Sequence, residues 1–201
     1  QTLLGHTSSV FALAYDQESK TLFSGSQDET VKVWTPNGSG EYHASSTQTL
    51  TGHSGSVRAL ALDQDSKTLF SGSEDLTSGI IKVWTRDGSG NYTASQTLSG
   101  HNSDWVRTLT YDQATKTLFS GSGDLTSGII KVWTPDGSGN YQKDATQTLA
   151  GHNSSYVLSL TYDQDTKVLF SGSYDKTIMV WTPDGSGNYT ATQTLSGHSD
   201  W

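Results

Sequence analysis

Residues 1–35 of this chain read QTLLGHTSSVFALAYDQESKTLFSGSQDETVKVWT, and close variants of this stretch recur three more times along the 201 residues. The phrase that opens it, Gln-Thr-Leu followed by one residue and Gly-His, occurs five times, at intervals of 47, 48, 51 and 46 residues. Leu-Phe-Ser-Gly-Ser and Val-Trp-Thr each occur four times, always in the same order. Self-similarity at such a period indicates a repeat protein, in which each unit is one supersecondary structure stacked on its neighbours.

Each unit is predicted to form four short β-strands. In the first unit we expect strands at residues 10–15, 21–26 and 31–34, with the next Gln-Thr-Leu segment as a polar outer strand. The first of these strands alternates large and small side chains, which is typical of a strand buried on both faces. We predict that its large face holds Phe11, Leu13 and Tyr15, and its small face Val10, Ala12 and Ala14.

Four-stranded units at this period, with no helical pattern between them, are typical of β-propeller blades. The Gly-His pair and the tryptophan that ends the third strand resemble the WD-repeat (WD40) family, and the resemblance covers nearly the whole chain. It implies an all-β propeller of four-stranded antiparallel blades, with four blades per chain. The family usually ends its third strand in Trp-Asp, whereas every copy here has Trp-Thr.

We expect a single repeat array over residues 1–201. Its predicted parts are an orphan outer strand at 1–4, repeats at 5–50, 51–98, 99–149 and 150–195, and the start of a truncated fifth repeat at 196–201. Repeats two and three carry three extra residues, within 76–79 and 125–128, which should enlarge the turn between their second and third strands. The near-identity of the repeats fits either recent amplification or deliberate design.

Serine, histidine, aspartate and tryptophan recur together in every repeat. Catalysis by a Ser-His-Asp triad needs one nucleophile in one singular setting, whereas here the same set appears four times. Resemblance to WD repeats implies instead a structural hydrogen-bond network in each blade, which satisfies polar groups that are costly to bury unpaired. We therefore predict no catalytic residue and no enzyme. The predicted network residues are His6, Ser24, Asp28, Trp34, His53, Ser71, Asp75, Trp84, His101, Ser120, Asp124, Trp133, His152, Ser171, Asp175 and Trp181.

Composition narrows the classes of partner. The chain has 12 basic and 20 acidic residues and a net charge of −8, which disfavours nucleic acid and anionic membrane surfaces. It has no cysteine, and no apolar run approaches the length of a membrane helix. We expect a soluble chain, with its compartment left open.

No metal and no cofactor is predicted. Equivalent histidines sit in different blades, too far apart to share one ion. Asp87, Asp136 and Asp184 each open an Asp-Gly-Ser-Gly-Asn segment that faintly resembles a calcium loop. These segments lack the spaced carboxylates and closing glutamate of such loops, so we expect hairpin turns instead.

Resemblance to the family implies that ligands dock near the central channel, at positions around the first valine of strand one and before the turn aspartate. These positions vary most between the repeats, and they are rich in residues that favour binding hot spots. The candidate partner-binding residues are Phe11, Gln27, Arg58, Glu74, Trp105, Arg107, Tyr156, Leu158 and Tyr174. The predicted function is a non-catalytic scaffold for protein or peptide partners. The alternatives are a structural or designed repeat without a native ligand, and a propeller enzyme or carbohydrate-binding module.

Four blades of this kind should close poorly into a ring. Open ends would leave unpaired strand edges and an apolar blade face exposed to solvent. We expect a homodimer through the open propeller ends, with eight blades around a two-fold axis. A monomeric four-bladed ring and a partial array are the alternatives. The five Gln-Thr-Leu segments exceed the four blades, so one of them must be displaced or pair with a partner.

Overall fold

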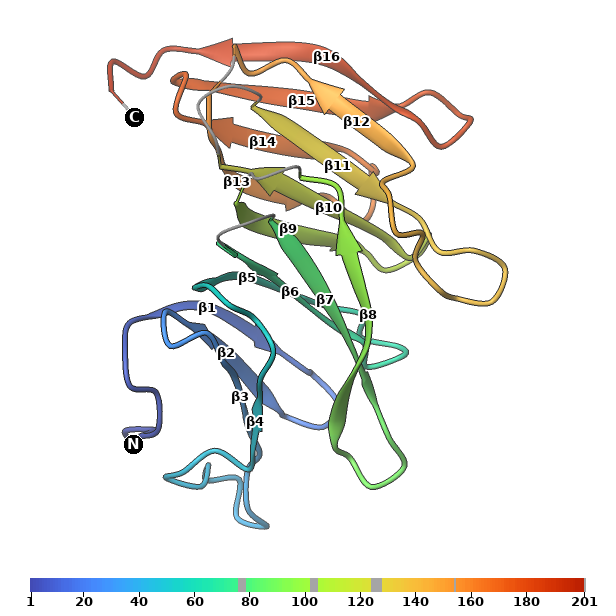
Figure 1. Ribbon diagram of the computed structural model, residues 1–201. Coiled ribbons are helices and arrows are strands. Elements are labelled where there is room, and N and C mark those ends of the chain that lie inside the picture. Colours follow the sequence, from blue (N-terminus) through green and yellow to red (C-terminus); the bar gives the residue numbers. More distant parts are fainter. Residues whose placement is uncertain (76–78, 102–104, 124–127, 154, 201) are drawn as a thin grey trace.

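The computed structural model describes residues 1–75, 79–101, 105–123, 128–153 and 155–200, and these form four antiparallel sheets of four strands each. The sheets follow one another from the N-terminal end (blue) to the C-terminal end (red), as the blades of a propeller do (Figure 1). The predicted all-β fold of four-stranded antiparallel blades is therefore confirmed. Of the described residues, none belongs to a helix long and apolar enough to cross a membrane.

Each blade takes its four strands in chain order. Blade 1 contains β1 (Val10–Tyr15), β2 (Leu22–Ser26), β3 (Val31–Trp34) and β4 (Gln48–Leu50). Blade 2 contains β5 (Val57–Leu62), β6 (Leu69–Ser73), β7 (Ile80–Arg86) and β8 (Tyr92–Ser99). Blade 3 contains β9 (Val106–Asp112), β10 (Thr117–Ser122), β11 (Ile129–Trp133) and β12 (Gln147–Ala150). Blade 4 contains β13 (Val157–Tyr162), β14 (Leu169–Ser173), β15 (Thr177–Pro183) and β16 (Tyr189–Ser196).

The alternation predicted for β1 is wrong at its N-terminal end. The register of β1 against β2 shifts between Val10 and Ala12, so Phe11 is the extra residue of a β-bulge. Because a bulge breaks the strict alternation of side chains, Val10 lies with Leu13 on one face, where both line the same hollow. The same register shift recurs in all four blades. In blades 1 to 3 the residue after the first valine, which is Phe11, Arg58 or Arg107, contacts a side chain of a neighbouring blade.

Apolar residues of neighbouring blades form three buried clusters, one at each junction between blades. A phenylalanine of the second strand, Phe23, Phe70 or Phe119, is fully buried in each cluster. Phe70 stacks on Tyr111 of the next blade with ring centroids 5.3 Å apart. Burial of one such side chain contributes roughly 1.5–3 kcal/mol, so the junctions between blades are the core of the molecule.

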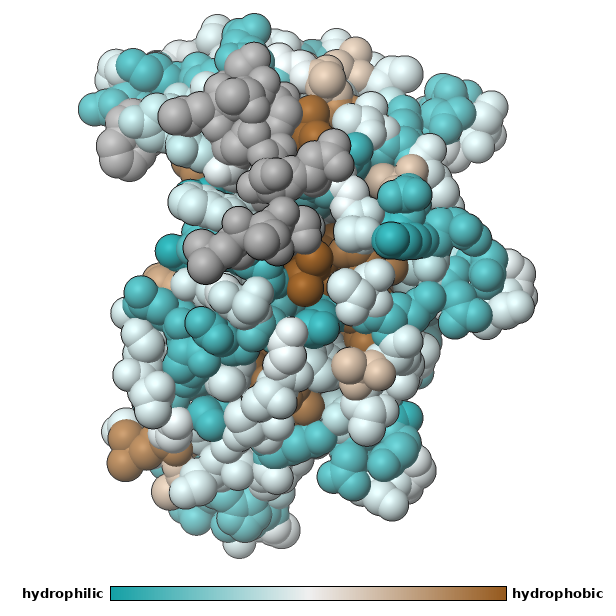
Figure 2. All heavy atoms as spheres, in the orientation of Figure 1, coloured by the Kyte–Doolittle hydropathy of each residue, from teal (hydrophilic) through white to brown (hydrophobic). Residues whose placement is uncertain are grey.

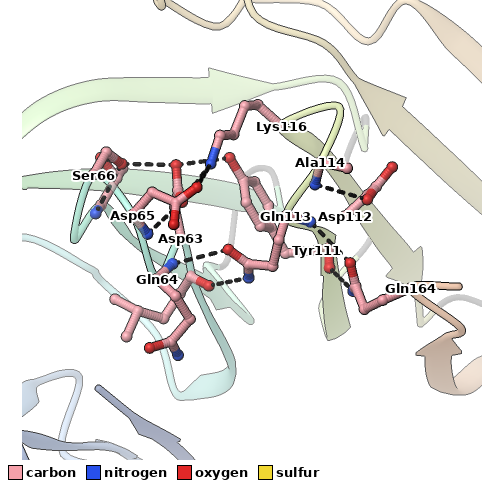
Figure 3. A network of polar contacts seen from close by, with 12 residues as sticks. Asp63, Gln64, Asp65, Ser66, Tyr111, Asp112, Gln113, Ala114, Lys116 and Gln164 are labelled. Carbon is pink, nitrogen blue, oxygen red and sulfur yellow. Dashed lines mark hydrogen bonds and ion pairs between the residues drawn. The ribbon is translucent and has the colours of Figure 1, made fainter. Parts of the chain in front are cut away.

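Polar side chains also join neighbouring blades, through a glutamine in the first turn of blades 2, 3 and 4 (Figure 3). Gln113 of blade 3 donates from Nε2 to the carbonyl of Leu62 at 2.9 Å, and its Oε1 accepts the N–H of Gln64 at 2.9 Å. Gln164 of blade 4 makes the same two bonds, to the carbonyl of Tyr111 and from the N–H of Gln113. One side chain thus fixes the position of two backbone groups in the preceding blade.

The first Gln-Thr-Leu segment lies beside blade 1 and outside its sheet. Leu4 forms one isolated parallel bridge with Ser45, and the Gln1 side chain donates to the carbonyl of Tyr42. The face in Figure 2 is largely hydrophilic, and hydrophobic atoms show mainly in the recesses between blades and near the N-terminus.

Candidate functional site

Each blade holds a series of hydrogen bonds that leads from its third strand to the loop before its first strand. In blade 1, Trp34 Nε1 donates to Ser24 Oγ at 2.8 Å, and Ser24 Oγ lies 2.7 Å from His6 Nε2. His6 Nδ1 lies 2.8 Å from Asp28 Oδ2. Because the serine hydroxyl can donate to Nε2, the imidazole proton sits on Nδ1 and faces the carboxylate.

The same contacts recur in the other blades. In blades 2 and 4 the His–Ser distances are 2.7 Å and the His–Asp distances 3.2 and 3.0 Å, joining His53, Ser71, Asp75 and Trp84, and His152, Ser171, Asp175 and Trp181. In blade 3, His101 lies 2.7 Å from Ser120 Oγ, which accepts Trp133 Nε1–H at 2.8 Å. Asp124, the predicted carboxylate of blade 3, lies outside the described residues.

Burial and hydrogen bonding set the charges of these networks. Burial acts to raise the pKa of Asp28, but hydrogen bonds from Thr30, the Thr7 N–H and His6 outweigh it and hold that pKa well below its usual value. Burial lowers the pKa of His53, and lowers that of His101 to about 3. The carboxylate is therefore ionised and these two imidazoles are neutral at pH 7.

The geometry of these networks does not favour catalysis. The four serines are at most 4 % exposed, and each Oγ already accepts an indole N–H and faces a histidine. A serine nucleophile must reach the carbon of a substrate, which these buried oxygens cannot do. In blades 1, 2 and 4 the arrangement pairs both nitrogens of the buried histidine with side chains of the same blade.

The Asp-Gly-Ser-Gly-Asn segments are turns held by their own aspartate. Asp87 Oδ1 accepts the N–H groups of Ser89 and Asn91 at 2.9 Å each, and Asp136 and Asp184 make the same pairs of bonds. An aspartate that bonds the backbone two residues on is a common way to fix a turn. Among the described residues, histidine, aspartate and glutamate nowhere gather in threes as metal ligands.

A hollow between blades 2 and 3 has its polar groups paired with one another. Its lining includes Asp63, Tyr111, Lys116 and Tyr141. The Tyr111 hydroxyl lies 3.1 Å from Asp63 and 3.0 Å from the Tyr141 hydroxyl, and Lys116 lies 3.1 Å from Asp63. Burial raises the pKa of Tyr141 to about 12, so its hydroxyl stays protonated. This hydroxyl donates a hydrogen bond to the carbonyl of Lys116. This groove joins blades and offers no singular reactive group.

The candidate partner-binding positions lie at one end of the blades, where strand one begins and strand two ends. The N–H of Glu74 bonds the carbonyl of Ser56 at 3.0 Å, and the N–H of Gly123 bonds the carbonyl of Trp105 at 2.8 Å. These backbone bonds bring the varied residues of each blade side by side. In blades 1 to 3, the residue after the first valine follows the β-bulge at this end and contacts a neighbouring blade.

Side chains from all four blades meet at this end. The Arg58 guanidinium carbon lies 3.8 Å from the centre of the Phe11 ring, and Arg58 Nε lies 2.9 Å from Glu74 Oε1. Arg107 lies 3.8 Å from the same carboxylate oxygen. Its guanidinium carbon is 5.0 Å from the Trp105 ring, within the range of a cation–π contact.

The aromatic side chains of blade 4 extend this series. The Arg107 guanidinium carbon is 4.9 Å from the centre of the Tyr156 ring, and Tyr156 meets Tyr174 edge to face at 5.8 Å. A Cβ at Gly123 would lie 2.3 Å from Arg107 Nε, so the glycine lets Arg107 lie across it. We call the following seven residues the top cluster: Phe11, Arg58, Glu74, Trp105, Arg107, Tyr156 and Tyr174.

Two candidate residues lie apart from the top cluster. Gln27 Oε1 accepts the Ser8 hydroxyl at 3.0 Å. Leu158 lines a hollow on the outer face of blade 4, together with Gly172.

Sequence reasoning did not assign the glutamines that join the blades, although Asp-Gln recurs at 16–17, 63–64, 112–113 and 163–164. That recurrence was the signal that could have found them.

Comparison with known proteins gives one family. The chain matches the family described as "WD domain, G-beta repeat" four times, over residues 1–35, 44–85, 92–134 and 143–182. These segments cover most of the chain. No curated protein matches it in a search by sequence.

Proposed function

The chain belongs to the WD-repeat family, and from this premise we propose that it binds a protein or peptide partner on its top cluster and catalyses no reaction there. WD repeats indicate a protein-interaction scaffold in general. The observation that supports this location is the series of contacts among aromatic, cationic and acidic side chains that extends across all four blades.

The top cluster combines rigidity with exposure. Glu74 and the aromatic rings hold both guanidinium groups in place, so little side-chain freedom remains to be lost on binding. Phe11, Trp105 and Tyr174 nevertheless keep 39, 37 and 36 % of their surface exposed. Partly exposed aromatic and arginine side chains on a fixed frame are what binding hot spots require.

The charges of the top cluster favour one class of peptide. Two arginines face one glutamate there, which leaves a positive site on a chain whose net charge is −8. Guanidinium groups bind carboxylates through paired N–H donors. We infer a partner segment that offers an acidic side chain to Arg58 or Arg107 and an apolar or aromatic one to Trp105.

A random peptide display library panned on the immobilised chain tests this proposal. Enriched peptides are then titrated against the wild-type chain and against Trp105→Ala, Arg107→Ala and Tyr174→Ala, with Thr93→Ala on the outer strand of blade 2 as the control. We expect at least a tenfold loss of affinity for each top-cluster variant and none for the control. Melting temperatures should change little, because the truncated side chains are partly exposed.

Two results would count against the proposal. Peptides that bind all four variants as well as the wild-type chain would move the binding surface elsewhere. A library that yields no peptide above background would favour the alternative of a structural repeat without a native ligand.

A further inference from the structure

At each junction between blades, the first valine of one blade rests on a glycine in the second strand of the preceding blade. A Cβ added at Gly25 would lie 2.7 Å from Val57 Cγ1, and one at Gly72 would lie 2.4 Å from Val106 Cγ1. The third junction repeats this contact between Gly121 and Val157, at 2.7 Å. All three valines are fully buried. This close valine–glycine contact is therefore a common feature of the three junctions at which one blade packs on another.

At the two ends of the array, the glycine and the valine of this contact are each present without the other. At Gly172, the equivalent glycine of blade 4, an added Cβ would meet only the hydroxyl of Ser159 among the described residues. At the opposite end, Val10 is 50 % exposed, although its three counterparts are fully buried. Blade 4 thus presents an uncovered glycine and blade 1 an uncovered valine.

The polar contacts between blades are divided in the same way. Lysines 67, 116 and 167 reach back to Asp16, Asp63 and Asp112 of the preceding blade at 3.0, 3.1 and 3.4 Å, and these three aspartates are buried. The equivalent Asp163 of blade 4 is only half-buried, and Lys20 of blade 1 is exposed. Lys20 has a φ of 57°, close to the 60°, 59° and 62° of the other three lysines, so its backbone is set in the same conformation.

Aromatic and aliphatic side chains complete the two faces. Tyr111 and Tyr162 stack on the second-strand phenylalanine of the preceding blade, whereas their counterpart Tyr15 is 37 % exposed. Phe170 of blade 4 is half-buried, although its three counterparts are fully buried. Leu195 of β16 is 46 % exposed, compared with 3, 1 and 3 % for the equivalent leucines in β4, β8 and β12.

We propose that blade 4 of one copy binds blade 1 of a second copy head to tail, and that two such contacts close two copies into one ring. Val10 then packs on Gly172, Tyr15 stacks on Phe170, and Lys20 pairs with Asp163. A second copy is the occupant because these three pairs repeat the Val–Gly, Tyr–Phe and Lys–Asp contacts that join blade 2 to blade 3 and blade 3 to blade 4. A head-to-tail contact closes into a ring when the rotation between copies allows it.

The N-terminal segment has to move for this contact to form. The Gln1 side chain donates to the carbonyl of Tyr42, as Gln48 Nε2 donates to the carbonyl of Tyr92 at the first junction. Residues 1–4 therefore hold the place that β16 of the second copy takes. β16 pairs with β15 over its whole length, whereas residues 1–4 contribute one bridge to blade 1, so the N-terminal segment is the one displaced.

Light scattering of the 201-residue chain across about 1–100 µM tests the proposal. We expect a mass of twice 21.6 kDa. Val10→Asp puts a charge in the contact and should weaken association at least about 100-fold, while the single chain tolerates it because Val10 is half exposed there. Thr93→Asp, on the outer strand of blade 2, is the matched control and should leave the mass unchanged.

A pair of glycine substitutions separates association from folding. Gly172→Ala should weaken association at least about tenfold, because its Cβ meets the Val10 of the second copy. Gly121→Ala creates the same clash with Val157 inside one chain, so it should lower the melting temperature instead. Trp105→Ala, which tests partner binding, should leave the mass unchanged.

Three results would overturn the proposal. The first is a folded wild-type chain that stays monomeric at all concentrations. The second is a dimer that Val10→Asp and Gly172→Ala leave intact, because its contact would then lie elsewhere. The third is a mass that keeps growing with concentration, because head-to-tail contacts that fail to close produce open polymers.

Discussion

At the scale of single residues, His101 differs from the other buried network histidines. It is 1 % exposed, and its Nδ1 has no hydrogen-bond partner among the described residues. Its Nε2 lies 2.7 Å from Ser120 Oγ, which also accepts the indole N–H of Trp133. Burial lowers the pKa of this imidazole, and the positive charge of Lys131 lowers it further, so the protonated form is disfavoured at this site.

This difference predicts how the stability of the chain depends on pH. The pKa of His101 is about 3 in the folded chain and about 6.5 in an unfolded one, so only the unfolded chain takes up this proton between those values. The stabilisation is complete above pH 6.5 and is lost as the pH falls, by on the order of 2 kcal/mol between pH 7 and pH 5. The pKa of His53 is also lowered, which acts in the same direction.

Urea denaturation at several pH values measures this dependence. His101→Gln should flatten the slope of unfolding free energy against pH by about one proton, whatever its effect on the stability itself. His43→Gln, at an exposed position, is the control and should keep the wild-type slope. An unchanged slope in His101→Gln would mean that this imidazole is protonated in the folded chain.

Sequence could indicate the members of the network but not the contacts of the top cluster. Histidine, serine and tryptophan recur at matching positions, so the resemblance to WD repeats names them directly. Glu74 lies between Arg58 and Arg107 because two different blades place their outward-turned residues at neighbouring positions. Such a contact depends on the rotation between one blade and the next. The spacing of residues within a repeat does not determine that rotation.

At the scale of elements, the four strands of each repeat could be predicted from period-two alternation and turn residues. The β-bulge at Phe11 could not, because its register shift is a property of the pairing between two strands. Because of this bulge, Val10 lies on the same face of β1 as Leu13, and Phe11 joins the top cluster. The glutamine of the first turn could not be assigned either, because its side chain bonds the preceding blade, whereas the aspartate before it holds the turn of its own blade.

The glutamine contacts between blades allow a matched test. Gln113→Ala removes the acceptor of the Gln64 N–H and the donor to the Leu62 carbonyl, and should cost about 1–2 kcal/mol of unfolding free energy. Gln17→Ala removes the equivalent blade 1 side chain, which makes no hydrogen bond to another blade among the described residues. At concentrations where the chain is monomeric, its cost should stay within about 0.5 kcal/mol. Equal losses in chemical denaturation would show that these bonds do not stabilise the junctions.

At the scale of the whole molecule, the three junctions and the two end faces consist of the same interacting groups. A repeat array gains its stability from such interfaces between neighbours, so blades 1 and 4 each have one interface fewer than blades 2 and 3. In Figure 1 the first and last sheets lie at opposite ends of the array, so each has a neighbouring blade on one side. The end blades are therefore the least stabilised parts of the single chain.

Association through the end faces should make the stability depend on concentration. Any partner that binds only the folded state stabilises it by mass action, and here the partner is a second copy. For a chain of this size, we expect the melting temperature to rise by about 1–3 °C for each tenfold increase in concentration above the dissociation constant. Val10→Asp should melt at one temperature throughout, equal to that of the dilute wild-type chain. A wild-type melting temperature that is constant from about 1 to 100 µM would mean that the end blades are stable without a second copy.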